Sequence, residues 1–273
     1  MHKKCSYHQE VVLKLKSLAA FDIQEFGRLQ TAAGVYPFFV VRVAGHAPDL
    51  PYIYIQAAIH GNEIAGIYAI LDFLNGDLGQ YKDFFNFIIV PLVNPFGFEH
   101  GTRTNEHGLD LNRNFKVENP EEEVRMLKAL IENEGKSFLA VLDLHEDPTD
   151  EAAVGFEDEK SPTAMYMYEQ YPADDFTFGR QVLEKLRTAG FEFWDGTIVF
   201  GEKCDRGLIH QFQTGIPVPL MQGSFDEYMG ARSRYILILE TPTCWDLKKR
   251  VQGHLEFLRT ALEALKNRVG LIR

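Results

Sequence analysis

Short apolar, β-favouring runs separated by longer segments with helical periodicity are the feature that most constrains this chain. The expected strands cover residues 38–43, 52–59, 87–92, 138–144, 218–221 and 235–239. Several of them are apolar at nearly every position, as strands are when helices cover both faces of their sheet. Alternation of such strands with helices is typical of strand-helix-strand units around a largely parallel sheet. The sequence therefore predicts an α/β fold.

Three expected helices have recognisable ends. One covers residues 63–76, and another covers residues 119–135, with Asn119 as its cap and a glycine at its end. The third, over residues 246–267, repeats leucine at helical spacing, which indicates a core face. The irregular stretch 146–176 is expected to be a long loop, either functional or simply solvated.

Composition narrows the class of protein. A chain of 273 residues, 45% of them hydrophobic, can bury one core, so a single domain over residues 1–273 is expected. The net charge of −11 argues against a nucleic-acid partner, which needs a basic surface. No run has the length of a membrane span, and no signal-peptide core is visible. An odd set of three cysteines without C-x-x-C spacing favours a cytoplasmic protein.

The sequence His60-Gly61-Asn62-Glu63 is the first candidate metal site. It follows the expected strand 52–59 and precedes a helix, where two side chains three residues apart can converge. Imidazole and carboxylate ligands suit zinc. Alone the pair is weak evidence, because a histidine that ends a strand is more often structural and a glutamate is favoured in the first turn of any helix.

His145 strengthens that hypothesis, because it ends the apolar strand 138–144. The carboxyl ends of parallel strands meet at one edge of a sheet, where ligands bind in open α/β folds. His60 is expected at the same edge. Two histidines and one glutamate, with a fourth position open, form a recurring catalytic zinc site.

Glu240 follows the last apolar strand, where an acid is costly to bury unless it is paired or works near a metal. It can cap the following turn, or it can exchange protons with water and a leaving amine during metal-assisted hydrolysis. Arg103 and Arg113 lie in a loop rich in glycine and asparagine, and guanidinium groups bind carboxylates and stabilise oxyanions. His100 and His107, in the same loop, are interpreted as structural or solvent-facing.

Taken in order, five elements resemble the zinc metallocarboxypeptidases of the carboxypeptidase A type, including the bacterial murein-peptide amidases. They are His-x-x-Glu at 60–63, Asn-Pro-x-Gly at 94–97, Asp-x-Asn-Arg-Asn-Phe at 110–115, then His145 and Glu240. The run 110–115 is the most specific of them. The resemblance implies a three-layer α/β/α sandwich around a mixed, mostly parallel eight-stranded sheet, and a single zinc carboxypeptidase-like catalytic domain.

The resemblance also implies the catalytic residues. One zinc ion per chain would be bound by His60, Glu63 and His145. Glu240 would be the general base, and Arg103 would polarise the scissile carbonyl. The chain would then be an enzyme, a zinc metallopeptidase.

Further residues would bind the substrate. By the same resemblance, Asn112 and Arg113 would hold its terminal carboxylate, and Asp110 would orient a ligating imidazole. Tyr228 is the best candidate for the tyrosine that closes over substrate. The pocket for the substrate side chain is expected in residues 222–234, which carry both acidic and basic residues, so its preferred charge stays open.

Two positions depart from the pattern and open the substrate question. Phe96 stands where the family commonly has aspartate, and Asn62 stands where proline or aspartate is common. The His-Gly-Asn-Glu form is more similar to the aspartoacylase and succinylglutamate desuccinylase branch. The function expected is hydrolysis of an amide next to a free carboxylate, with peptides as substrates. The alternatives are an N-acyl-amino-acid deacylase and an inactive relative that only binds carboxylates.

Overall fold

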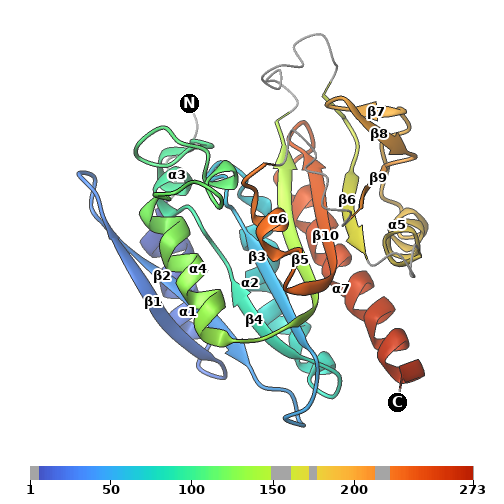
Figure 1. The fold of residues 1–273 in the computed structure, drawn as a ribbon, viewed down its shortest axis with the longest axis horizontal. Coiled ribbons are helices and arrows are strands. Elements are labelled where there is room, and N and C mark those ends of the chain that lie inside the picture. The colour runs from blue at the N-terminus through green and yellow to red at the C-terminus, as the bar shows by residue number, and fades with distance from the viewer. Residues whose placement is uncertain (1–5, 149–160, 172–176, 213–221, 273) are drawn as a thin grey trace.

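The computed structural model describes residues 6–148, 161–171, 177–212 and 222–272 (Figure 1). Its strands are β1 (Asp22–Gln30), β2 (Val35–Val43), β3 (Tyr52–Ala57), β4 (Asn86–Val90), β5 (Phe138–Asp147), β6 (Tyr166–Tyr171), β7 (Ile198–Val199), β8 (Glu202–Asp205), β9 (Leu208–Phe212) and β10 (Ser233–Pro242). Its α-helices are α1 (Leu13–Ser17), α2 (Ala65–Gly76), α3 (Pro95–His100), α4 (Glu122–Glu134), α5 (Phe178–Thr188), α6 (Phe225–Met229) and α7 (Leu247–Ile272). Shorter helical turns are η1 (His8–Val12), η2 (Leu78–Tyr81) and η3 (Leu111–Arg113).

One sheet runs through the described residues in the order β1-β2-β4-β3-β5-β10-β6-β9-β8-β7. The central strands β4, β3, β5 and β10 are parallel. Antiparallel pairs flank them, with β2 on β4 at one side and β6 on β10 at the other. The mixed sheet is confirmed, but the expected count of eight strands is wrong, because the described residues form ten.

Alternate side chains of the central strands enter two separate cores, which gives the three layers. Ile53 and Ile55 of β3 pack into the core that contains the apolar faces of α2, α5 and α7. Tyr54, between them, belongs to the opposite core, under α4 and α6. In Figure 1, α4 lies in front of the sheet and α2 behind it. Helices therefore cover both faces of the central strands, as their nearly continuous apolar sequences predict.

Several boundaries differ from the expected ones, and three of the differences concern the candidate site or a predicted cap or loop. Strand 52–59 ends at Ala57, because Ala58 has a φ of 52° and turns the chain out of the sheet. Helix 119–135 begins at Glu122, so Asn119 is not its cap, while Gly135 does end it with a left-handed φ of 58°. In the expected loop 146–176, β5 continues to Asp147 and residues 166–171 form β6. The expected strand 218–221 lies outside the described residues.

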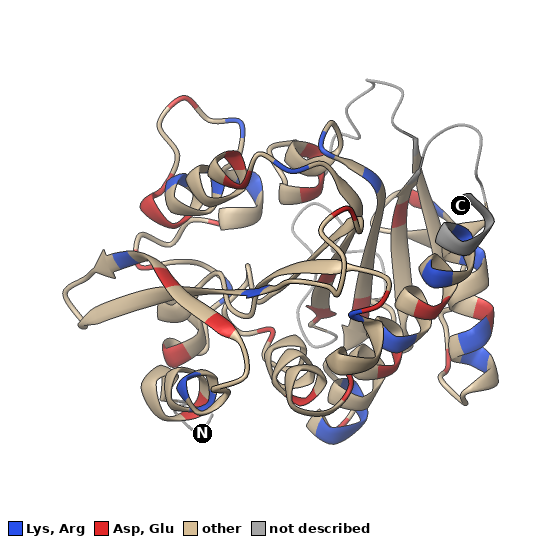
Figure 2. Cartoon of the chain, turned by 90° about the horizontal axis from the view of Figure 1, so that it is seen from below, with Lys and Arg blue, Asp and Glu red and all other residues tan. Residues whose placement is uncertain are grey.

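Charged residues are distributed over all the layers. Figure 2 shows the positions of acidic and basic residues interspersed along the described elements. Among the helices that the structure describes, none is both long and apolar enough to cross a membrane.

Candidate active site

Period-two alternation in the central strands gathers the polar residues of the site on one face of the sheet. Gln56 of β3 pairs in register with Asp143 of β5. His145, two residues further along β5, pairs in register with Glu240 of β10. Because residues two apart in a strand point to the same face, all four side chains lie on the α4 and α6 side of the sheet.

Two glycines explain how His60 reaches this edge. A Cβ on Gly61 would lie 2.3 Å from the Cα of Gly97, so the two backbones touch where the motifs at 60–63 and 94–97 cross. The Gly61 N–H donates to the Arg103 carbonyl at 3.2 Å, and the Asn94 side chain donates to the same oxygen at 3.3 Å. Only glycine allows this approach, which fixes the turn that presents His60 and Glu63.

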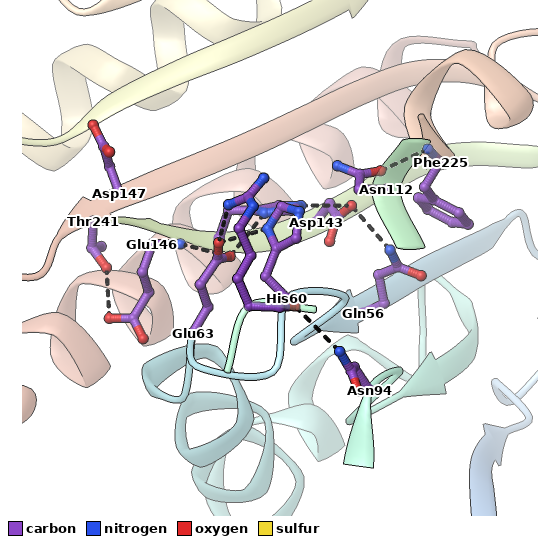
Figure 3. Close-up of polar contacts among 12 residues, drawn as sticks. Gln56, His60, Glu63, Asn94, Asn112, Asp143, Glu146, Asp147, Phe225 and Thr241 are labelled. Atoms are coloured by element: carbon purple, nitrogen blue, oxygen red, sulfur yellow. Dashed lines mark hydrogen bonds and ion pairs between the residues drawn. The ribbon is translucent and has the colours of Figure 1, made fainter. Parts of the chain in front are cut away.

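His60, Glu63 and His145 are buried and converge on one point. Figure 3 shows Glu63 beside His60. One Glu63 oxygen, Oε1, lies 2.6 Å from His60 Nδ1, and the other, Oε2, lies 2.9 Å from His145 Nδ1. One nitrogen or oxygen from each residue lies within 4.8 Å of the others, as metal ligands require. The structure therefore brings together the three ligands expected from the sequence.

The outer nitrogen of each imidazole faces a carboxylate. Asp110 Oδ1 lies 3.2 Å from His60 Nε2, and Asp143 Oδ2 lies 3.3 Å from His145 Nε2. Metal-ligating histidines are oriented in this way, since a proton held on Nε2 leaves Nδ1 free to ligate. The donor set thus fits a metal ion that prefers nitrogen and oxygen ligands.

Sequence reasoning missed Asp143 and the hydrogen bonds behind it. Gln56 donates to Asp143 Oδ2 at 3.0 Å, and the Tyr54 hydroxyl donates to Gln56 at 3.1 Å. This buried chain holds the carboxylate that holds His145. The available signal was the Asp-x-His spacing, which puts both side chains on one face of a strand.

The charges of the site interact strongly. Burial opposes ionisation of Glu63, but His60 and His145 hold its pKa below the usual value. Burial raises the pKa of Glu240 well above its usual value; His145 opposes this shift, and the nearby Glu63 charge adds to it. Two carboxyl groups with opposite shifts in one site are typical of acid-base chemistry.

Arg103 lies at the edge of the ligand set. Its Nη2 is 3.1 Å from Asp110 Oδ2, and its Nη1 is 3.4 Å from Glu63 Oε1. Its side chain is 37% exposed, so the guanidinium reaches from the buried carboxylates to the surface. A group in this position can stabilise negative charge that develops beside the metal ligands.

The residues expected to bind a substrate carboxylate are next to one another. Asn112 is buried, and its Oδ1 accepts a hydrogen bond from the Phe225 N–H at 2.8 Å, which ties the loop to the start of α6 (Figure 3). Arg113 is exposed, and its Nη1 donates to the Asn112 carbonyl at 2.7 Å. The guanidinium therefore remains accessible to a ligand.

Tyr228 is not brought to the ligand set in this structure. Its hydroxyl donates to Glu132 of α4 at 3.1 Å, and its ring centroid lies 5.5 Å from that of Phe115. The Arg232 guanidinium lies 4.1 Å from the centroid of the Tyr228 ring. Its role as the closing tyrosine stays a prediction.

Comparison with known proteins agrees with this geometry. The model of the succinylglutamate desuccinylase/aspartoacylase catalytic domain matches residues 49–171. That segment includes the motifs from His60 to His145 but not Glu240. No curated protein sequence matches the chain.

Solved structures match over almost the whole chain. A candidate metallopeptidase from Shewanella amazonensis has a TM-score of 0.74 and 24% identity, covering 94% of this chain and 91% of its own. A metallo-carboxypeptidase from Burkholderia cenocepacia has a TM-score of 0.65 and 18% identity, covering 94% of this chain and 68% of its own. One from Pseudomonas aeruginosa, in complex with (2-guanidinoethylmercapto)succinic acid, has a TM-score of 0.62 and 17% identity, covering 93% and 68%.

At these identities the likeness concerns the fold. The chain has a metallocarboxypeptidase-like α/β/α fold, and the resemblance drawn from the sequence, to the carboxypeptidase A type and its succinylglutamate desuccinylase/aspartoacylase relatives, is confirmed.

Proposed function

We propose that this chain is a zinc-dependent hydrolase that cleaves an amide bond next to a free carboxylate, as a metallocarboxypeptidase acting on peptides. The observation that carries the proposal is the Glu63 carboxylate between two imidazole Nδ1 atoms, at 2.6 and 2.9 Å, with each Nε2 facing another carboxylate. A purely structural cluster would not need both histidines oriented in this way.

His60, Glu63 and His145 would hold the zinc ion, one per chain. When bound, zinc would supply Lewis acidity that acts on a substrate carbonyl and on water. Glu240, in register with His145, would accept a proton from the attacking water and pass it to the leaving amine. Its raised pKa suits a group that must carry a proton between two partners.

Charged residues beside the ligands would bind and orient the substrate. Arg103 would stabilise the negative charge that develops on the scissile carbonyl oxygen. Arg113, with Asn112, would hold the free carboxylate, so that the neighbouring amide is fixed near Glu240. The (2-guanidinoethylmercapto)succinic acid bound to the Pseudomonas aeruginosa neighbour carries carboxylates, which supports this class of ligand.

A second candidate is an N-acyl-amino-acid deacylase that uses the same residues on a smaller substrate. The match of residues 49–171 to the succinylglutamate desuccinylase/aspartoacylase catalytic domain favours it. A third candidate is a carboxylate-binding relative without activity. The combination of a ligand set with Glu240 argues against it, since binding alone does not require a base.

One experiment separates the three candidates. Purified protein is analysed for zinc, and the zinc-loaded form is tested on peptides, amidated peptides, and N-acetyl and N-succinyl amino acids. Hydrolysis of peptides with a free carboxyl terminus supports the peptidase, and hydrolysis of acyl-amino acids alone supports the deacylase. A protein without stoichiometric zinc, or with zinc but without turnover, contradicts a hydrolase.

The proposal includes one catalytic domain over residues 1–273 and a cytoplasmic location. The odd number of cysteines, three in the sequence, without C-x-x-C spacing supports a reducing compartment. Recovery of the protein in an oxidising compartment after cell fractionation would contradict the location.

A further inference from the structure

A buried polar cluster lies behind the metal ligands, on the opposite face of the sheet. Glu146 directly follows His145 in β5, so its side chain points to the other side, toward α2 and α7. Its carboxylate pairs with Arg250 of α7, and Thr241 of β10 donates to it at 3.4 Å. Thr241 in turn lies 3.1 Å from the ring nitrogen of His254. None of the expected catalytic roles uses this cluster.

The Glu146 side chain also caps helix α2. Its Oε2 accepts a hydrogen bond at 2.8 Å from the N–H of Ala65, the first residue of that helix. Helix α2 starts two residues after Glu63, so this bond fixes the segment that carries the central metal ligand. A carboxylate at a helix N-terminus is favourable in itself, because it meets unpaired N–H groups.

The Glu146 backbone makes a second, separate bond to the same ligand. Its N–H donates to Glu63 Oε2 at 3.1 Å (Figure 3). Glu146 thus holds Glu63 in two ways. Its backbone N–H binds the Glu63 carboxylate, and its side chain binds the start of helix α2, which follows Glu63. Gly66 permits this docking, because a Cβ there would lie only 2.8 Å from the Cβ of Leu144 in β5.

Burying Glu146 and Arg250 is costly. A buried ion pair contributes little to net stability, because the loss of hydration offsets most of the attraction. The pair is nevertheless completely formed here, with no accessible surface on the Glu146 side chain. A role in fixing the geometry of Glu63 accounts for both charges.

We propose that Glu146, held in place by Arg250, is a positioning residue that sets the Glu63 carboxylate between His60 and His145. The inference rests on the proposed function, because it concerns the same metal site. It goes beyond that function in assigning the affinity and geometry of the metal centre to a residue on the far face of the sheet.

The test compares metal binding in Glu146→Gln, Arg250→Met, the double variant and a matched control. Glutamine keeps an acceptor for the Ala65 N–H but removes the charge. The control, Glu169→Gln, changes another buried glutamate in the same sheet. The Oε1 atom of Glu169 lies 2.6 Å from His210 Nδ1. Zinc affinity is measured by chelator competition, and site geometry by the visible spectrum of the cobalt-substituted protein.

We expect Glu146→Gln to weaken zinc binding by about 10- to 100-fold, as changes to groups that orient metal ligands typically do. The cobalt spectrum should change in this variant and stay unchanged in Glu169→Gln. The double variant leaves no unpaired buried charge, so it should fold even if a single variant does not, and its zinc affinity should remain reduced.

Zinc binding by Glu146→Gln and the double variant with the wild-type affinity and spectrum would overturn the positioning role and leave the hydrolase proposal intact. An equal loss in Glu169→Gln would also overturn it, since the effect would then be general destabilisation. Failure of the wild-type protein to bind zinc would overturn both proposals. Zinc binding that depends on Glu146, without hydrolysis of any substrate class, would overturn only the proposed function.

Discussion

Glu63 occupies the point where most interactions of the site meet. Its two oxygens face different histidines, and Arg103 approaches one of them at 3.4 Å. A carboxylate is expensive to remove from water unless it is paired, and the two imidazoles hold its pKa below the usual value despite burial. The ligands are therefore already assembled around a charge, and a metal ion would need little rearrangement to bind.

Glu240→Gln tests the proposed base at the scale of one residue. Glutamine keeps the size of the side chain but cannot take up a proton, while His60, Glu63 and His145 are untouched. We expect zinc content to remain one per chain and kcat to fall by about 10²- to 10⁴-fold, the usual contribution of a general base. Zinc content and steady-state kinetics measure this, and full turnover in the variant would remove Glu240 from the mechanism.

Asp226 indicates which charge the substrate side chain should carry, a question that the sequence leaves open. Of the charged residues in segment 222–234, Asp226 is buried, whereas Glu227 pairs with Lys116 and Arg232 stacks on Tyr228. Burial raises the pKa of Asp226, with nearby Asp143 adding to the shift and Arg113 opposing it. A cationic substrate side chain would offset the cost of that buried carboxyl group.

We therefore predict that the enzyme prefers lysine-like or arginine-like side chains and that Asp226→Asn reduces the preference. The ratio of kcat/KM for a cationic over a neutral side chain should fall by about 10-fold, as loss of one charge interaction of roughly 1.4 kcal/mol implies. Paired peptides that differ only in that side chain measure the ratio. An unchanged ratio would exclude Asp226 from the pocket.

The buried imidazole of His254 should make the free energy of unfolding depend on pH. It is fully buried, and burial lowers its pKa to about 3. In the unfolded chain its pKa is about 6.5, so below that pH the unfolded state takes up a proton that the folded state does not. This contribution to stability is complete above pH 6.5 and is lost as the pH falls toward 3.

Between pH 7 and 5, the free energy of unfolding of the wild type should fall by about 2 kcal/mol more than that of His254→Gln, which does not titrate. Urea unfolding at both pH values measures the difference. An equal fall in the free energy of unfolding of both proteins between pH 7 and 5 would show that His254 takes up its proton in the folded state as well.

At the scale of elements, helix α2 packs closely against the sheet just after the candidate ligand Glu63. Alanine at Gly66 would place its Cβ 2.8 Å from the Leu144 Cβ and 2.9 Å from the Ala57 Cβ. We expect Gly66→Ala to destabilise the fold by roughly 1–3 kcal/mol, as overpacking does. Gly76, at the other end of the helix, has no atom within 4 Å of such a Cβ.

Gly76→Ala is the matched control. Because alanine is the better helix former, it should be neutral or stabilise by up to about 1 kcal/mol. Urea unfolding of both variants gives the comparison, and zinc affinity should fall in Gly66→Ala alone. Equal stability of the two variants would show that the start of α2 can move away from β5 without cost.

The central elements could be predicted from the sequence, and the edges of the sheet could not. Strands β2, β3, β4, β5 and β10 are covered on both faces, so their apolar runs are continuous. Strand β1 is mostly exposed and β7 has two residues, so neither carries such a run. Strand β6, rich in tyrosine, lies in a stretch without clear periodicity.

The same contrast holds in the candidate site. His60, Glu63 and His145 were predictable, because each is a chemically distinctive residue at the end of a recognisable strand or turn. Asp143 and Glu146 were not, because their partners come from distant segments. The Asp-x-His spacing puts Asp143 on the face of His145, but its contact with Gln56 depends on sheet register, and the contact of Glu146 with Arg250 depends on the packing of α7; neither contact is visible in a local pattern.

At the scale of the whole molecule, the parallel centre of the sheet is what makes the site. Three parallel strands, β3, β5 and β10, end at one edge, and each is followed by or contains a residue of the candidate site. Eight solved structures that share this fold cover 92–97% of the chain at 16–24% identity, so the fold persists when most side chains differ. The position of the site follows from topology, and its chemistry follows from a few residues.

Zinc should therefore stabilise the whole fold, because its ligands come from two different strand ends and from the start of α2. A ligand that binds only the folded state adds about 4 kcal/mol at 1,000 times its dissociation constant. For a chain of this size, that corresponds to a rise in Tm of roughly 10 °C. Differential scanning calorimetry of the zinc-loaded and the chelator-treated protein measures the shift, which readdition of zinc should restore.

His60→Ala provides the control for that shift. Loss of one of three ligands should abolish the zinc-dependent rise in Tm. The metal-free variant should also be less stable than the metal-free wild type, because Glu63 loses one of its two imidazole partners, so each Tm is compared with that of the same protein without metal. Magnesium, which prefers oxygen ligands, should produce no comparable rise in the wild type. Equal Tm values with and without zinc would contradict a metal centre at His60, Glu63 and His145, whereas a zinc effect that survives in His60→Ala would place the bound ion elsewhere.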